Sequence, residues 1–302
     1  MTKDKKKKVN IWVKLILSTV LLVVLSVGGY SLTVYQNAKE TVNEHLYHQV
    51  ETIDREVVKT KVKAQQSLNV LLLGVDERSY DRGRSDAMMV LSLDPSEDKA
   101  QLISIPRDTR TEIVGRGTED KINHAYAFGG PDMSIASVEN LLDIELDYYV
   151  RVNMEGLAEL VDAVGGITIE NDIAFQDFQI GTLQLTGEEA LSYVRMRKQD
   201  PRGDFGRTER QRKVIQGIID QGATIGSVTK INDLLGVLGE NVATNMDFDD
   251  MKNVMFNYKD TRKNFSTYQL QGSGTYIDGI YYMTVTDEEV EKVHNMIVKK
   301  TS

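Results

Sequence analysis

Hydrophobic positions divide the chain into an apolar N-terminal segment and a long region of mixed pattern. Residues 15–38 contain no charged side chain, and residues 15–32 are their most apolar part. About 20 apolar residues in a helix cross a bilayer, so this segment predicts one transmembrane signal anchor. A cleaved signal peptide is the alternative, but its apolar region is usually only about 7–15 residues long. The lysine-rich residues 1–14 predict a cytoplasmic N-terminus, and hence a single-pass type II protein of the cell membrane with an extracellular body.

Residues 39–68 form a second unit that contains neither proline nor glycine. Apolar side chains recur there at helical spacing, at Val42, Leu46, Val50, Ile53 and Val57. The spacing predicts a helical stalk between the membrane and the body. Its apolar face could pack on the body or on a second copy of the chain, which would make a homodimer.

From residue 69 onward, short apolar runs alternate with helical patterns. The predicted strands are 69–75, 87–93, 101–105, 148–152, 167–170, 267–271 and 281–285. The predicted helices include 133–142, 155–164, 186–194 with a capping box at its start, 207–221 and a closing C-terminal helix. Nothing resembling a linker interrupts residues 69–302, so they are predicted to form one α/β domain.

Composition excludes several classes of function. The chain has 36 Lys and Arg residues against 45 Asp and Glu, and its net charge of −9 argues against general nucleic-acid binding. The absence of cysteine excludes thiolate catalysis, zinc–thiolate sites and disulfides. Neither a P-loop, a dinucleotide-binding glycine motif nor a serine-hydrolase G-x-S-x-G motif is present.

Charged residues gather where the first three predicted strands begin and end. Asp76 follows the first strand and Asp86 begins the second, so an antiparallel return would bring both to one end of the sheet. After another reversal, the third strand ends there with Arg107. The sequence therefore predicts one charged rim composed of Asp76, Arg78, Arg84, Asp86, Arg107 and Asp108. An ordinary solvated polar rim is the alternative.

A second charged cluster spans residues 195–213, with six arginines and two lysines against three acidic residues. Arg207 and Gln211 lie four apart on a predicted helix and so share one side of it. Arginine suits phosphate recognition because its guanidinium is planar and always charged. A solvated helix face is again the alternative. Carboxylates beside many arginines are typical of a Mg²⁺-assisted phosphoryl site, which predicts a phosphate-rich substrate.

Four sequence blocks in this region resemble the LytR-CpsA-Psr family. They are 69–78 (NVLLLGVDER) with 83–86 (GRSD), 104–109 (SIPRDT), 121–126 (KINHAY), and 193–197 (YVRMR) with the acidic, arginine and glutamine positions that follow. The resemblance implies a mixed central β-sheet flanked by helices in an α/β/α arrangement. It also implies a phosphotransferase that moves an anionic glycopolymer, most closely wall teichoic acid, from a polyprenyl-diphosphate carrier to a peptidoglycan sugar hydroxyl.

The same resemblance assigns roles to particular residues. It implies Mg²⁺, or Mn²⁺, on Asp76 and Asp86. It implies that the diphosphate is bound by Arg84, Arg107, Arg195, Arg197, Arg207 and Gln211. The residues implied to be catalytic are Asp76, Asp86, Arg107 and Asp204. An apolar pocket between the sheet and the helices would take the polyprenyl tail.

Other functions remain open at this stage. The same site with water as the nucleophile would be a polyprenyl-diphosphate hydrolase, and a site without turnover would be a lipid-binding or wall-polymer-binding scaffold. A transcriptional attenuator is disfavoured, because the basic N-terminal segment is too short to fold as a DNA reader.

Overall fold

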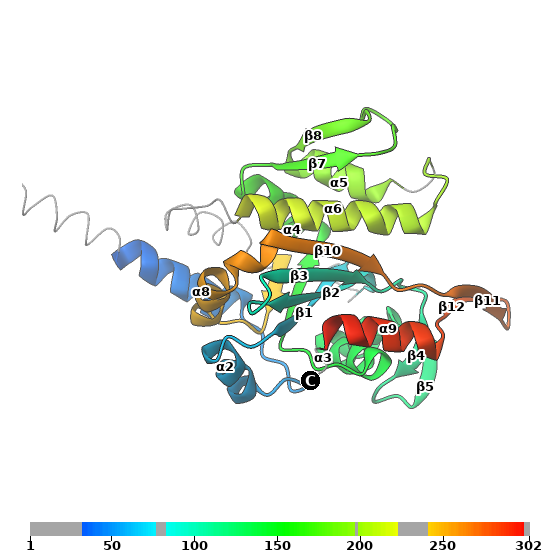
Figure 1. Ribbon diagram of the computed structural model, residues 1–302, viewed down its shortest axis with the longest axis horizontal. Coiled ribbons are helices and arrows are strands. Elements are labelled where there is room, and N and C mark those ends of the chain that lie inside the picture. The colour runs from blue at the N-terminus through cyan, green and yellow to red at the C-terminus, as the bar shows by residue number, and fades with distance from the viewer. Residues whose placement is uncertain (1–31, 77–82, 197–198, 223–240, 299–302) are drawn as a thin grey trace, which may run out of the picture.

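The computed structural model describes residues 32–76, 83–196, 199–222 and 241–298, and a central six-stranded sheet organises them (Figure 1). The strand order is β10-β3-β2-β1-β6-β9, and parallel and antiparallel pairs are mixed. Its strands are β1 (Leu68–Val75), β2 (Ser85–Asp94), β3 (Lys99–Ser104), β6 (Tyr148–Asn153), β9 (Val242–Thr244) and β10 (Asn264–Gln269). The predicted α/β fold with a mixed central sheet is confirmed.

Helices cover both faces of this sheet (Figure 1). On one face lie α2 (Arg55–Lys63), α3 (His124–Leu142) and α9 (Asp287–Ile297); on the other lie α4 (Met154–Ala163), α5 (Gly187–Arg195) and α6 (Asp204–Gly222). The helices α8 (Phe248–Asn257) and η3 (Lys259–Lys263) connect the edge strands β9 and β10. The main core lies between the sheet and the first group, and the second group forms a separate apolar cluster with a small hairpin.

Three two-stranded hairpins project from these layers, and most of their strands were not predicted. They are β4 (Arg110–Ile113) with β5 (Thr118–Lys121), β7 (Ile167–Asn171) with β8 (Gly181–Leu185), and β11 (Ser273–Ile277) with β12 (Ile280–Thr284). Such short strands bury little, and β5 consists only of polar residues. An apolar alternation strong enough to reveal them is therefore missing from the sequence.

Helix α3 begins before the predicted range 133–142, and a break in the backbone divides it into two parts. Gly130 has φ +65° inside it, and Pro131 starts the second half. Positive φ carries no steric cost for glycine, and proline is tolerated in the first turn of a helix. The prediction from sequence found only the part of the helix after this break.

The predicted stalk packs on the body of its own chain. Residues 32–41 are helical and η1 (Val42–Leu46) continues them. Residues 48–50 belong to neither a helix nor a strand, and α2 follows. Val42 and Leu46 are buried against β9 and α8, while Val50, Ile53 and Val58 join the main core. One continuous helix over 39–68 is therefore wrong. Most of the apolar side chains of this segment are buried by its own chain.

Two adjacent valines of α2 test whether this segment stabilises the domain. Val58 is 4% exposed and Val57 is 51% exposed. We expect Val58→Ala to lower the free energy of unfolding by about 2 kcal/mol, because buried methyl groups lose their contacts. Val57→Ala, the matched control, should change it by less than about 0.5 kcal/mol. Denaturant unfolding of the full chain in detergent measures both; equal effects would contradict the packing.

The predicted membrane anchor at 15–38 falls mostly outside the described residues. Within the ranges that are described, no helix combines the length and apolar character needed to cross a bilayer.

Candidate active site

A bulge at the start of β2 places Asp86 at the end of the central strands. β1 and β2 pair regularly until Gly74 lies opposite Ala87, and the next pair is Val75 with Ser85, so Asp86 is the extra residue. Bulges bend a strand, redirect a side chain and are common beside active sites. Glycine is required at position 74, because a Cβ there would lie 2.9 Å from the Cβ of Ala87.

Arg107, just after β3, is the centre of the charged rim. Its Nη1 donates a hydrogen bond to Oδ1 of Asp86 at 2.7 Å. Its Nε lies 3.7 Å from Oδ2 of Asp108 and 3.6 Å from Oδ2 of Asp204. This Nε is buried and makes no hydrogen bond to any residue in the described ranges. Arg107 therefore joins three carboxylates, and its buried Nε is close to two of them without a hydrogen bond to either.

The carboxylates around Arg107 fix its charge. Burial alone would lower the pKa of Arg107, but the hydrogen bond and charge of Asp86, with the charges of Asp204 and Asp108, raise it above its ordinary value. The guanidinium is therefore a permanent cation in a half-buried position. Such a group can bind a phosphate oxygen at any pH at which the protein is folded.

The N-terminus of α6 lies at the same end of the sheet (Figure 1). Asp204 is the first residue of α6, and its Oδ1 is 2.9 Å from Nη2 of Arg207. The first turn of a helix has backbone N–H groups without intrahelical partners and favours negative charge. The rim therefore combines side-chain cations with a helix N-terminus.

Two further predicted residues lie at the end of β1. The N–H of Asp76 donates to the carbonyl oxygen of Arg84 at 3.4 Å, and both side chains are exposed. The predicted convergence is thus confirmed for Asp86, Arg107 and Asp108, with Asp76 and Arg84 beside them. Arg78 lies outside the described residues.

The remaining predicted residues come from α5 and α6. The predicted capping box at the start of α5 is present, and Arg195 is the exposed last residue of that helix. Gln211 is half-buried one turn after Arg207 on α6. Arg197 lies outside the described residues. The roles of these side chains stay predictions.

Arg210, in the middle of the second charged cluster, belongs to the core. It is 2% exposed and forms an ion pair with the buried Asp200. Its Nε donates to the carbonyl of Tyr193 at 3.1 Å and its Nη2 to that of Met196 at 2.6 Å. These bonds attach α6 to the end of α5, so this arginine positions the site and is not available to an anion.

Asp200 makes part of the stability sensitive to acid. Burial by itself would raise the pKa of Asp200, but hydrogen bonds from Arg202 and Arg210 lower it to about 2. A carboxyl group with a lowered pKa stabilises the fold above its unfolded pKa of about 3.9, and this stabilisation is lost as the pH falls through the folded value. We expect a loss of about 2 kcal/mol between about pH 4 and pH 2.

Urea unfolding at several pH values measures this loss. Asp200→Asn should cost about 3–5 kcal/mol near neutral pH, because Arg210 stays buried without its carboxylate, and should flatten the profile between pH 4 and pH 2. Asp143→Asn is the control, since that side chain is 94% exposed. A variant profile as steep as that of the unmodified protein would contradict the assignment.

Two cations beside the rim were not singled out from the sequence. Nζ of Lys121 lies 2.7 Å from Oδ1 of Asp108. Nη1 of Arg212 donates to Oγ of Ser104 at 3.1 Å and to Oε1 of Gln269 at 3.0 Å, which joins α6 to the ends of β3 and β10. Burial lowers the pKa of Arg212. Lys121 begins one of the four recognised blocks, whereas no sequence signal separates Arg212 from its neighbouring arginines.

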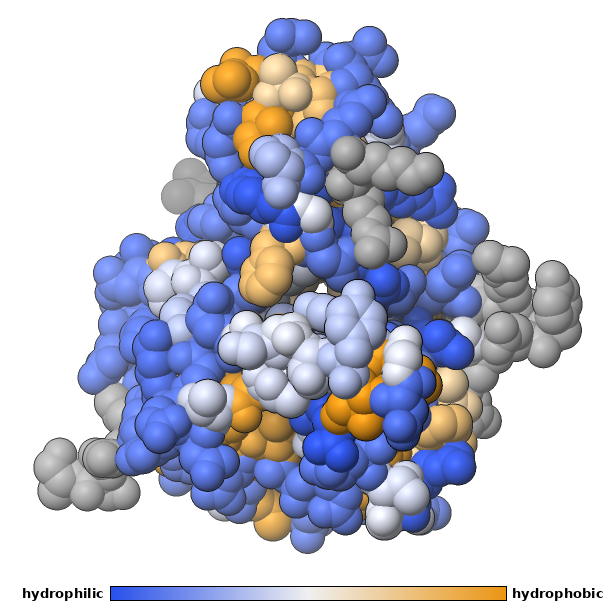
Figure 2. Space-filling model, turned by 90° about the vertical axis from the view of Figure 1, so that its right-hand side faces the viewer, coloured by the Kyte–Doolittle hydropathy of each residue, from blue (hydrophilic) through white to orange (hydrophobic). Residues whose placement is uncertain are grey.

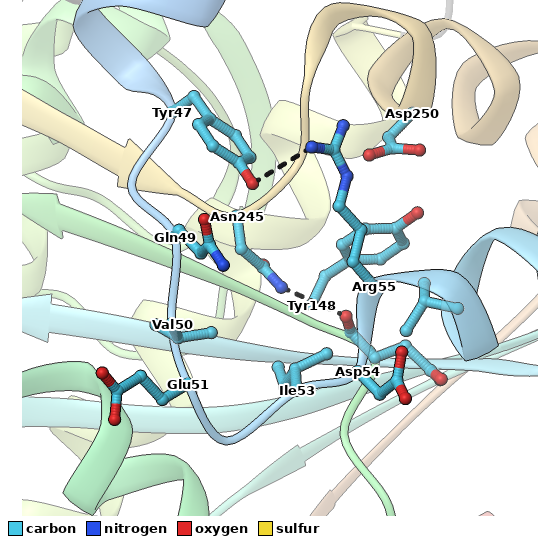
Figure 3. A pocket seen from close by; sticks show the side chains of 12 residues that line it. Tyr47, Gln49, Val50, Glu51, Ile53, Asp54, Arg55, Tyr148, Asn245 and Asp250 are labelled. Carbon is cyan, nitrogen blue, oxygen red and sulfur yellow. Dashed lines mark hydrogen bonds between the residues drawn. The ribbon is translucent and has the colours of Figure 1, made fainter.

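A cavity of about 250 Å³ lies away from the rim, between the segment 47–58 and the edge of the sheet (Figure 3). None of the predicted site residues lines it. Two of its charged groups form ion pairs with their neighbours: Arg55 with Asp247, and Asp147 with Lys61 at 2.8 Å. These pairs hold the N-terminal segment on the body, and we do not assign the cavity to the active site.

Comparison with known proteins identifies similar chains over nearly the whole length. The LytR_cpsA_psr family matches residues 30–299. The polyisoprenyl-teichoic acid--peptidoglycan teichoic acid transferase TagU of Bacillus anthracis is 47% identical over an alignment of 301 residues, and the alignment covers 97% of each chain. TagU of Bacillus subtilis (strain 168) is 42% identical over an alignment of 297 residues, which also covers 97% of each chain.

Solved structures share the architecture. The crystal structure of B. subtilis TagU has a TM-score of 0.65 at 42% identity, covering 78% of this chain and 99% of that one. TagT bound to LI-WTA has a TM-score of 0.67 at 29% identity, covering 84% and 95%.

Proposed function

Since the chain belongs to the LytR_cpsA_psr family, we propose that it is a phosphotransferase that attaches wall teichoic acid to peptidoglycan. The donor is the polymer on a polyprenyl diphosphate, and the acceptor is a sugar hydroxyl of peptidoglycan. The observation that carries this proposal is the rim itself. Arg107, Arg207 and the N-terminus of α6 gather cationic donors where a diphosphate needs them, beside several carboxylates.

The diphosphate binds across this rim. The buried Nε of Arg107 is a donor suited to a phosphate oxygen, since it makes no hydrogen bond within the described ranges. Arg84 and Arg195 would add cations around it, and Gln211 would contribute from α6, one turn after Arg207. Arg197, which the resemblance places in the same role, lies outside the described residues. These positive groups neutralise the charge that grows on the phosphoryl oxygens and on the leaving phosphate.

Asp76 and Asp86 would hold Mg²⁺ where β1 ends and β2 begins. Within the described ranges, no group of three or more acidic or histidine side chains is arranged for a metal ion. Two carboxylates nevertheless fit Mg²⁺, which commonly keeps waters and substrate phosphate oxygens as its other ligands. When bound, the ion would neutralise charge on the diphosphate.

The transfer replaces the phosphoanhydride bond of the carrier diphosphate with a phosphoester bond to the acceptor sugar. The acceptor oxygen forms a bond to the polymer-side phosphorus, the bond from that phosphorus to the bridging oxygen breaks, and polyprenyl phosphate leaves. Asp108 and Asp204 are the carboxylates beside Arg107 that can accept the hydroxyl proton. Energy comes from the diphosphate bond, so no nucleotide is needed.

The polyprenyl tail enters between the sheet and α6. Leu72, Leu91 and Val150 lie in the middle of central strands and remain only partly buried. They share the sheet face of Ser104, which is bound by Arg212 of α6. Apolar side chains left partly open on this face suit an isoprenoid chain.

The anchor at 15–38 would keep the domain at the external surface of the cell membrane, where the polyprenyl-diphosphate donor would be available. The lysines of residues 1–14 support a cytoplasmic N-terminus and the type II orientation.

The test uses the full chain in detergent with Mg²⁺, a short-tailed synthetic lipid-diphosphate glycan and peptidoglycan oligomers, followed by mass spectrometry. We expect a glycan–phosphate–peptidoglycan adduct. Free glycan phosphate without adduct would identify a hydrolase. Tight donor binding without any product would identify a binding scaffold, and either result would overturn the proposal.

A further inference from the structure

The hairpin of β11 and β12 presents two tyrosines to solvent. Tyr276 and Tyr281 lie directly opposite each other across the hairpin and therefore share one face. Tyr276 is 74% exposed and Tyr281 is 40% exposed, and their ring centroids are 5.6 Å apart with an edge-on geometry. A Cβ on Gly274 would lie 2.8 Å from the ring of Tyr281, so the glycine lets this ring lie along the strand.

The opposite face of the hairpin is held by the body. The hydroxyl of Tyr282 is 3.4 Å from Oδ1 of Asp120, and Nζ of Lys121 lies 5.8 Å from the centroid of its ring. Met283 is buried. These contacts anchor the hairpin to the body. Tyr276 and Tyr281 contact each other across the hairpin and leave much of their ring surface exposed to solvent.

The hairpin is continuous with the candidate active site. The N–H of Met283 donates to the carbonyl oxygen of Asp108 at 2.8 Å, and Asp108 is the neighbour of Arg107 in the rim. The hairpin projects at this end of the molecule in Figure 1, and Figure 2 looks onto that end. A patch of intermediate hydropathy occupies the middle of that view, and strongly hydrophilic residues surround much of it.

The chemistry of the hairpin selects an uncharged partner. Residues 272–284 contain no lysine or arginine and a single acidic residue, Asp278. A polyanionic teichoic acid or an anionic lipid surface would require cations there. A sugar ring instead offers polarised C–H groups to the negative face of an aromatic ring and hydroxyls to its phenol group.

We propose that Tyr276 and Tyr281 bind the uncharged sugar rings of the acceptor glycan strand and lead it to the rim beside Asp108. This inference rests on the proposed transfer reaction and names the surface that its acceptor uses. The donor diphosphate then reaches the rim along α6 and the ends of the central strands. The acceptor glycan reaches it along the β11–β12 hairpin.

The test compares transfer kinetics of the full chain and of Tyr276→Ala/Tyr281→Ala. We expect the KM for the acceptor glycan to rise about tenfold or more, because interface aromatic residues carry a large share of binding free energy. The KM for the lipid-diphosphate donor should stay unchanged. Tyr276→Phe/Tyr281→Phe keeps both rings and should recover most of the affinity. Ile180→Ala, at another exposed apolar residue, is the matched control.

A binding measurement separates this inference from the proposed function. An uncharged N-acetylglucosamine oligomer is titrated into the full chain in detergent, and we expect binding that the double alanine variant loses. An unchanged acceptor KM, or unchanged oligomer binding, would overturn the inference while transfer itself stands. If the double alanine variant lost binding to anionic vesicles but kept the acceptor KM, the tyrosines would form a membrane contact. That result would also overturn the inference. If the unmodified chain transfers nothing, the proposed function fails, and oligomer binding alone decides the role of the tyrosines.

Discussion

Asp86→Asn is expected to lower kcat/KM for transfer by about a thousandfold or more. Asparagine has nearly the shape of aspartate but removes the charge that pairs with Arg107 at 2.7 Å and that would hold Mg²⁺. The side chain is one-third exposed, so the neutral amide can be solvated and the fold should persist. The adduct formed from donor and peptidoglycan oligomer, counted by mass spectrometry, measures the loss.

A matched control separates a local effect from a general loss of charge. Asp143→Asn removes one carboxylate from an exposed position with φ +52°, which asparagine adopts readily, and should leave transfer unchanged. Circular dichroism and the unfolding midpoint should be the same for both variants. If Asp86→Asn kept transfer within about threefold of the unmodified chain, with the same Mg²⁺ dependence, the assignment of Asp86 would be wrong.

Arg107→Ala is expected to weaken binding of the lipid-diphosphate donor by about 10- to 100-fold. Each charge-assisted hydrogen bond to the diphosphate is worth about 1.5–3 kcal/mol, and about 1.4 kcal/mol corresponds to a factor of ten. The variant also leaves Asp86, Asp108 and Asp204 without the cation between them, and their mutual repulsion opposes an anionic ligand. Titration with a fluorescent short-tailed lipid diphosphate measures the dissociation constant.

Arg107→Lys should give an intermediate result, because lysine restores the charge but not the planar set of N–H donors. Arg262→Ala, at an exposed arginine away from the rim, should bind the donor normally. Donor affinity that is unaltered in Arg107→Ala would show that the diphosphate binds elsewhere, even if transfer were lost.

The convergence of Asp86 and Arg107 could be predicted from the sequence, because short turns between the first strands determine where those strands begin and end. Only residues 95–98 separate β2 from β3, so the chain must reverse and bring Asp86 and Arg107 to one end of the sheet. The bulge itself could not be read, because its position depends on the close approach of Gly74 and Ala87 in neighbouring strands.

The arginines of α6 were predicted to form one anion-binding cluster, but the structure separates them. Arg207 faces the rim while Arg210, three residues later, is buried with Asp200. Arg210 is four residues before the buried Val214 and seven before the buried Gly217, so it lies on the apolar stripe of the helix. That periodicity indicated burial, although the density of charge suggested a common anion site.

By itself, the sequence determined the α/β class, the main strands, the family and the convergence of Asp86, Arg107 and Asp108 at one end of the sheet. These follow from apolar periodicity, short turns and motif spacing, which depend on residues close together in the chain. Only the tertiary structure decided that Asp204 meets Arg107, that the segment 42–63 packs on the body, and that the β11–β12 hairpin stands beside Asp108. Those contacts join residues far apart in the sequence, and their free energy comes from burial and charge pairing that exist only once the layers have packed together.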